Sequence, residues 1–299
     1  MGRRSRLIAG LAVLLVAAAV AAGFALSRND DDSPRLAGRI AVVDGCGLRH
    51  MWPDGTNRRE LCLPGIWASV SLSAEGKTLA WDTVNGTQSG LTVARADASD
   101  HHQLLLPSGV NVAPSLSPDG RQVSFLHSPR DDGRYDIWTT STSAFSDVAE
   151  QVTTVRDVSF VSWAPSGDRL AYVKDWSEET LEGKIVLVRP DDGDEERLLG
   201  QGDEPAWAPD GKRIVFVRAG NLWTTALDGS EQRLLVRDGH APAWSRDGRQ
   251  LAFVREEKCG RPVCKERVFL VFGDGSDPRA VGPKFASGHR VLWFPDPNE

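Results

Sequence analysis

A five-residue motif that recurs through the chain constrains the fold more than any other feature of the sequence. It consists of Trp or Leu, then Ser or Ala, then commonly Pro and Asp, and finally Gly. The five copies begin at Leu72, Leu116, Trp163, Trp207 and Trp244, and their glycines are spaced by 44, 47, 44 and 37 residues. A regular period of this size indicates a chain built from stacked or radially arranged structural repeats.

Each copy of the motif is followed by short apolar runs that are separated by Asp-Gly or similar turn pairs. Asp-Gly accepts the left-handed backbone of a tight hairpin, and Pro fixes the preceding φ, so the motif predicts a turn between two antiparallel strands. No stretch after position 38 has a useful helical periodicity. Four short strands in each unit of about forty residues predict an all-β fold, a β-propeller with four-stranded antiparallel blades.

The two ends of the chain carry complementary halves of a further repeat. The C-terminal half is Trp293–Pro297, one strand and its turn, and the N-terminal half, Arg39–Leu61, supplies three strands. Pairing the halves would leave no free sheet edge, which is the advantage of a closed ring. We therefore predict a six-bladed β-propeller whose ring is closed by both termini.

Over residues 38–297 the repeats resemble the WD-like, PD40-type β-propeller repeat of TolB. Units of that repeat carry Trp-Ser-Pro-Asp-Gly, then a short Ala-Phe strand, and later a Leu-Trp strand. The matching residues here include Trp207–Gly211, Ala252-Phe253 and Leu222-Trp223, whereas Arg246 stands where the pattern has Pro. The resemblance implies a TolB-like six-bladed propeller.

The N-terminus has the pattern of a membrane anchor. An uninterrupted apolar run at residues 7–26 follows a basic tail at 1–6, and it is long enough to span a bilayer as a helix. The positive-inside rule keeps the tail cytoplasmic and places the remaining chain outside. We predict a single-pass transmembrane signal anchor at 7–26, a polar linker at 27–37 and the propeller domain at 38–299. The alternative is a cleaved signal peptide and a secreted or periplasmic protein.

Composition and motifs argue against several classes of function. The net charge of −6 disfavours nucleic acid as a partner. The sequence contains neither a Gly-x-Ser-x-Gly nucleophile elbow nor a glycine-rich phosphate loop. We therefore predict a monomeric, non-enzymatic protein without a cofactor.

The four cysteines fit an oxidising compartment, in which disulfides are their expected use. Cys46 and Cys62 flank a predicted hairpin and can face each other, while Cys259 and Cys264 bracket a four-residue loop. The alternative is zinc, which needs ligand pairs two to four residues apart, and positions 46 and 62 do not provide one.

The register of the repeats predicts a candidate site. Residues three and four positions before the motif are expected at the mouth of the central channel, where successive repeats bring together distant side chains. The polar or aromatic candidates at these positions are Phe160, Asp203, Glu204, His240, His289 and Arg290. The first interpretation is a solvated rim, the second a surface that binds a protein or peptide, and the third a metal or catalytic centre without fixed geometry.

Two hypotheses about function follow from these patterns. The first is a membrane-anchored, extracytoplasmic scaffold that binds a protein or peptide partner in the cell envelope. The alternative is a metal-assisted lyase or hydrolase at the channel mouth, centred on His240 and His289.

Overall fold

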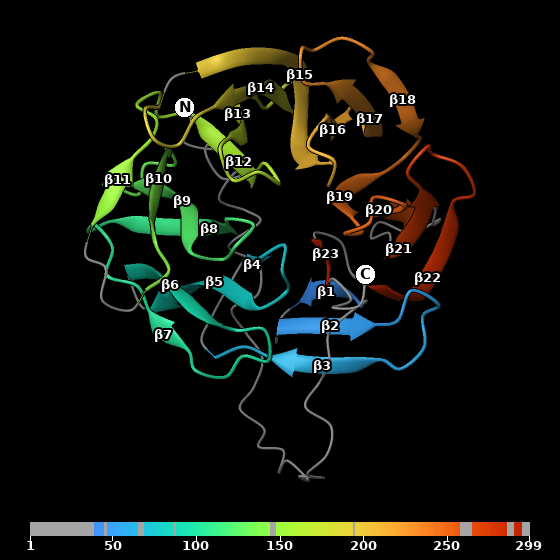
Figure 1. The fold of residues 1–299 in the computed structure, drawn as a ribbon, viewed down its shortest axis with the longest axis horizontal. Helices are drawn as coiled ribbons and strands as arrows, with labels where there is room; N and C mark the ends of the chain where they lie inside the picture. Colours follow the sequence, from blue (N-terminus) through green and yellow to red (C-terminus); the bar gives the residue numbers. More distant parts are fainter. Residues whose placement is uncertain are drawn as a thin grey trace, which may run out of the picture.

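Every regular element in the described part of the chain is a β-strand, and the strands form sheets that radiate around a central axis (Figure 1). The computed structural model describes residues 39–44, 47–64, 69–85, 88–143, 148–193, 195–257, 265–285 and 290–294. The all-β propeller that the repeats predict is therefore confirmed.

Four of the sheets contain four strands each. The first sheet is β23 (Val291–Trp293), β1 (Ile40–Asp44), β2 (Gly47–Met51) and β3 (Arg59–Cys62). The second is β4 (Val70–Leu72), β5 (Thr78–Asn85), β6 (Gln88–Arg95) and β7 (His102–Gln103). The third is β8 (Val110–Leu116), β9 (Gln122–Ser128), β10 (Asp136–Ser141) and β11 (Ala149–Gln151). The fourth is β19 (His240–Trp244), β20 (Gln250–Glu257), β21 (Lys265–Phe272) and β22 (Arg279–Phe285).

The remaining sheet has seven strands because one long strand belongs to two repeats. Its order is β12 (Val158–Trp163), β13 (Leu170–Ser177), β14 (Glu182–Val188), β15 (Glu195–Trp207), β16 (Arg213–Arg218), β17 (Asn221–Ala226) and β18 (Arg233–Val236). The first part of β15, up to Gly202, pairs with β14, and the part from Asp203 onward pairs with β16. Each part of β15 thus completes a four-stranded unit with its own neighbours.

The two ends of the chain meet in one sheet, as the complementary half-repeats predict. Strand β23 pairs antiparallel with β1, with Ile40 opposite Trp293 and Val42 opposite Val291. The Phe294 amide also donates to the carbonyl of Arg39 at 2.8 Å. This pairing holds the ring together through backbone hydrogen bonds rather than through loops.

The motif turns have the geometry that their sequence predicts. In all five copies the glycine amide donates to the carbonyl of the residue three positions earlier, at 2.8–3.0 Å. These glycines have φ between 65° and 77°, a left-handed conformation that residues with a Cβ adopt at a cost. The turn has a second hydrogen bond in three copies. The carboxylates of Asp119, Asp210 and Asp247 each accept it from the backbone amide two residues later.

In five repeats, a buried aromatic residue lies on the second strand, whereas the second strand of the closing repeat, β1, has none. Trp81, Phe125, Tyr172 and Phe253 are fully buried, and Phe216 is nearly so. The motif tryptophans lie on the first strand, where one side borders the central channel, so they are less uniformly covered. Trp163 and Trp207 are 7% exposed, and Trp244 and Trp293 are half-buried.

Two motif tryptophans link neighbouring repeats around the channel. The indole of Trp163 donates to the carbonyl of Ser115 at 2.9 Å, and that of Trp207 donates to the carbonyl of Ser162 at 3.2 Å. The buried indole nitrogen of Trp244 has no hydrogen-bond partner among the described residues. The same motif position therefore contributes packing in every repeat but a hydrogen bond in only some of them.

Several sequence predictions concern residues outside the described ranges. The anchor at 7–26, the linker at 27–37 and the side chains of Cys46, Cys259, Cys264 and His289 are among them. Cys62 is disulfide-bonded, while the pairing of the four cysteines stays a prediction. Within the ranges that are described, no helix has the length and hydropathy needed to cross a bilayer.

Ring closure can be tested by truncation. Deleting residues 290–299 removes β23 and leaves the edge of β1 unpaired, so we expect a lower melting temperature and self-association through that edge. Deleting only 296–299 keeps Phe294 and serves as the control. A 290–299 deletion that melts like the parent and stays monomeric would contradict closure by this pairing.

The two classes of motif tryptophan should respond differently to substitution. Trp207→Ala should cost about 3–5 kcal/mol, as large-to-small core changes do. Trp207→Phe should cost about 1 kcal/mol through the lost hydrogen bond and unpaired carbonyl, whereas Trp244→Phe removes a donor without a partner and should cost less. Chemical denaturation measures all three. Equal costs for the two Trp→Phe variants would show that the hydrogen bond contributes nothing.

Candidate functional site

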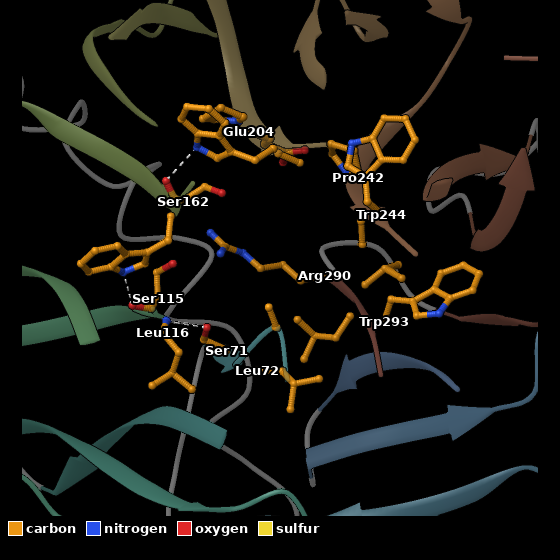
Figure 2. Close-up of a pocket in the computed structure, with 18 of the residues that line it drawn as sticks. Ser71, Leu72, Ser115, Leu116, Ser162, Glu204, Pro242, Trp244, Arg290 and Trp293 are labelled. Carbon is orange, nitrogen blue, oxygen red and sulfur yellow. Dashed lines mark hydrogen bonds between the residues drawn. The ribbon is translucent and has the colours of Figure 1, made fainter. Parts of the chain in front are cut away.

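The first strand of each repeat lines a central cavity of about 360 Å³ (Figure 2). These strands are β4, β8, β12, the second part of β15, β19 and β23. Because the cavity is enclosed by six separate segments of chain, its lining residues come from positions 70–293 of the sequence. It is therefore a product of the whole ring rather than of any one repeat.

The wall of the cavity differs from one side to the other. At the position just before the motif, three repeats present Ser71, Ser115 and Ser162. The other three repeats present Ala206, Ala243 and Leu292 there. The Ser71 hydroxyl accepts the Leu116 amide at 2.9 Å, so at least one serine is used within the wall (Figure 2).

A β-bulge recurs near the start of the lining strands. Four residues at the same repeat position have positive φ although none is glycine: Ala113, Phe160, Glu204 and Ala241, with φ of 52°, 44°, 48° and 50°. The strand ladders shift register at each of these places. Bulges redirect side chains, and here Phe160, Glu204 and Ala241 line the cavity.

The structure brings together only part of the predicted site. Phe160, Glu204 and Arg290 line the cavity as the repeat register predicts. Asp203 and His240 precede the bulge residue and are not among the residues that line the cavity, so their predicted place at the channel mouth stays a prediction. Neighbouring positions of a strand face opposite ways, which separates them from Glu204 and Ala241. His289 lies outside the described residues.

Asp203 is held between two repeats instead. Its Oδ2 accepts the indole N–H of Trp176 at 3.3 Å, and its Oδ1 accepts the Glu204 amide at 2.8 Å. Burial raises the pKa of Asp203 to about 7, and the Glu204 carboxylate adds to the increase. The two hydrogen bonds and the charge of Arg290 oppose this shift without cancelling it.

His240 forms an ion pair beneath the mouth. Its Nε2 lies 3.3 Å from Oε1 of Glu266, whose side chain is buried. Burial lowers the pKa of His240, but the hydrogen bond with Glu266 and the nearby carboxylates of Glu204, Glu266 and Glu256 outweigh burial and raise it. The imidazole thus lies beside a buried carboxylate of the same sheet, and a proton on His240 would compensate that charge.

Two carboxylates hold the bulges in place by accepting their amides. Glu204 Oε2 accepts the Ala241 amide at 2.5 Å, and Asp82 Oδ2 accepts the Ala113 amide at 3.2 Å. Asp82 is 2% exposed and also accepts the amide and hydroxyl of Ser69, both at 2.7 Å. Sequence analysis missed Asp82, although an acidic residue directly after the apolar run Leu79–Trp81 was a signal that could have found it.

Arg290 is the cation of the channel mouth. Its guanidinium carbon lies 4.9 Å from the centre of the Phe160 ring, and its side chain extends into the cavity (Figure 2). Its backbone carbonyl accepts the Val43 amide at 3.1 Å, so the closing strand pair also fixes this arginine. No cluster of three or more His, Cys, Asp or Glu that could hold a metal occurs among the described residues.

The sequence model of the TolB beta propeller domain family matches this chain over residues 47–280. A curated relative, an uncharacterised protein of Agrobacterium fabrum, is 28% identical over 171 residues, which are 52% of this chain and 55% of the relative. The chain thus spans about half the length of this relative.

Solved structures with the same fold include TolB from Acinetobacter baumannii, with a TM-score of 0.69 and 18% identity, covering 87% of this chain and 67% of that one. A putative TolB from Agrobacterium tumefaciens has a TM-score of 0.60 and 18% identity, and the match covers 86% of this chain and 98% of that one. Oligogalacturonate lyase in complex with manganese has a TM-score of 0.54 and 14% identity, covering 74% of this chain and 66% of that one.

The raised pKa of Asp203 predicts a pH dependence of stability. Between the unfolded value of 3.8 and about 7, the native state keeps a proton that the unfolded chain has released, so stability falls as pH rises through this window. Asp203→Asn removes the titration, and the stability of the variant relative to the parent should increase from pH 4 to pH 7.

Thermal melts over this pH range provide the measurement, with Asp210→Asn as the control because Asp210 is an exposed turn carboxylate. Parallel stability curves for the parent and Asp203→Asn would contradict the pKa assignment.

Proposed function

The chain belongs to the TolB beta propeller domain family, and on this premise we propose that it is a non-enzymatic scaffold that binds a protein or peptide segment through its channel. The observation that carries the proposal is the cavity itself, a concave and partly open site with a mainly apolar wall and several polar groups. In this proposal the ring is a six-bladed propeller, since β15 divides into the last strand of one blade and the first strand of the next.

The mouth has features of a recognition surface rather than of a merely hydrated rim. The Arg290 guanidinium is placed over an aromatic ring, and aromatic and arginine side chains are enriched among residues that dominate binding energy.

We further propose that the protein is anchored by residues 7–26, with the propeller outside the membrane. Arg39, the first described residue, lies next to Phe294, at the end of the lining strands that carries the motif turns. Phe160 and Arg290 lie at the opposite end, where β23 and β12 begin. A linker of eleven residues, which spans at most about 40 Å, would then present the mouth away from the bilayer.

Site-specific photocrosslinking tests the scaffold proposal in intact cells. A photoreactive phenylalanine analogue at position 160 should form an adduct with a protein partner, and the same analogue at Phe272, a 47% exposed residue outside the cavity lining, should not. Ala206→Trp fills the channel and should abolish the adduct at position 160. Adducts of equal yield at both positions, or adducts that survive Ala206→Trp, would contradict binding in the channel.

The enzyme alternative predicts a different result. A metal-assisted lyase or hydrolase centred on His240 and His289 should purify with a stoichiometric metal ion that His240→Ala releases, with loss of the associated stabilisation. Metal analysis of the purified full chain measures this directly, and a metal that His240→Ala abolishes would replace the scaffold proposal.

A further inference from the structure

Arg290 is an exposed cation that lines the cavity and forms no ion pair with another described residue. Among the described residues, no carboxylate lies within ion-pair distance of its guanidinium, although it stacks on Phe160 and lines the cavity. Stacking on an aromatic ring restricts an arginine without consuming its hydrogen-bond donors, which stay available for a planar acceptor. The arginine is thus preorganised for a group that this chain does not supply.

The carboxylates near Arg290 are already engaged. Glu204, on the same level of the channel, directs Oε2 to the Ala241 amide. Asp203 accepts hydrogen bonds from Trp176 and from the Glu204 amide and does not line the cavity. Both acidic side chains are therefore held by hydrogen bonds within the wall, while the Arg290 guanidinium has no ion-pair partner among the described residues.

A second arginine lines the same cavity near its other end. Arg246 is exposed and stands where three other copies of the motif have Pro118, Pro165 and Pro209, which also line the cavity. The wall between the two arginines is formed mainly by aliphatic, aromatic and proline residues of the lining strands. A ligand that fills the channel thus meets a cation near each end and apolar surface between them.

Resting on the proposed function, we propose that Arg290 is the receptor for a carboxylate of the ligand, so that the channel binds an acidic, extended peptide segment. The guanidinium fork and a carboxylate form paired charge-assisted hydrogen bonds, which give both affinity and orientation. Apolar side chains next to the acidic residue would pack on Leu72 and Leu292, which are half-buried in the wall.

Acidic sugars offer the same carboxylate chemistry, but the wall fits a peptide better. The indoles of Trp163 and Trp207 are 7% exposed, and both donate their N–H to the neighbouring strand. These two indoles are therefore part of the wall and offer no open ring face for a sugar, which leaves only the half-buried Trp244 and Trp293 among the tryptophans that line the cavity.

Peptide selection on the purified full chain tests the proposal. Random peptides displayed on phage are selected on the parent protein and, in parallel, on Ala206→Trp, whose channel is filled. Peptides that bind only the parent should be enriched in Asp and Glu. A synthetic peptide from this set should lose at least about tenfold in affinity on Arg290→Gln, and a similar amount when its acidic residue is replaced by the amide.

Matched variants separate charge from fold. Arg290→Lys keeps the charge without the fork and should bind with intermediate affinity. Arg249→Gln removes an exposed arginine outside the cavity lining and should leave the affinity unchanged. Melting temperatures of the variants confirm that the propeller is folded in each case.

Each alternative result of the selection contradicts a different part of the proposal. Parent-specific peptides without acidic enrichment, or acidic peptides that bind Arg290→Gln equally well, overturn the role of Arg290 and leave the scaffold function standing. Peptides that bind the parent and Ala206→Trp alike, or no selected peptides, contradict binding in the channel itself. Arg290-dependent binding of tri-galacturonate in place of peptides would assign the site to acidic sugars.

Discussion

The pairing of β23 with β1 is the contact on which the rest of the structure depends. It joins the two ends of the folded chain by backbone hydrogen bonds and turns a row of sheets into a ring. The same segment carries Arg290, whose carbonyl accepts the Val43 amide immediately before the strand begins. Closing the ring therefore also encloses the cavity and brings Arg290 to Phe160, a residue 130 positions earlier in the sequence.

Carboxylates in this propeller act mainly on the backbone. Asp119 and its equivalents close the motif turns, while Asp82 and Glu204 hold bulge amides of a neighbouring repeat. A buried carboxylate is costly unless it accepts several hydrogen bonds, and Asp82 meets this condition with three protein donors. Since these acidic groups accept hydrogen bonds from the wall, the cations that line the cavity, Arg290 and Arg246, are the groups that could receive a carboxylate of a ligand.

The sequence was sufficient to predict the fold because its turn chemistry is local and repeated. Gly120 and Gly211 adopt the left-handed turn that Asp-Gly favours, and the period between such turns determines the length of each repeat. The register of the repeats also placed Phe160, Glu204 and Arg290 correctly. For Asp203 and His240 the repeat gives the level along the channel but not the direction in which a bulge turns the side chain. Their contacts with Trp176 and Glu266 could therefore not be predicted. Asp82 was missed because its role depends on a contact with Ala113, 31 positions later.

The coupling between Arg290 and an acidic residue of a bound peptide tests the central claim most directly. A double-mutant cycle combines Arg290→Gln with replacement of the peptide's acidic residue by its amide, and calorimetry gives the four binding free energies. If the Arg290 guanidinium pairs with a peptide carboxylate, we expect a coupling free energy of at least about 1 kcal/mol that decreases as the salt concentration rises. A coupling free energy of zero would contradict this claim if both single changes still weaken binding. It would show that Arg290 does not bind the acidic residue of the peptide.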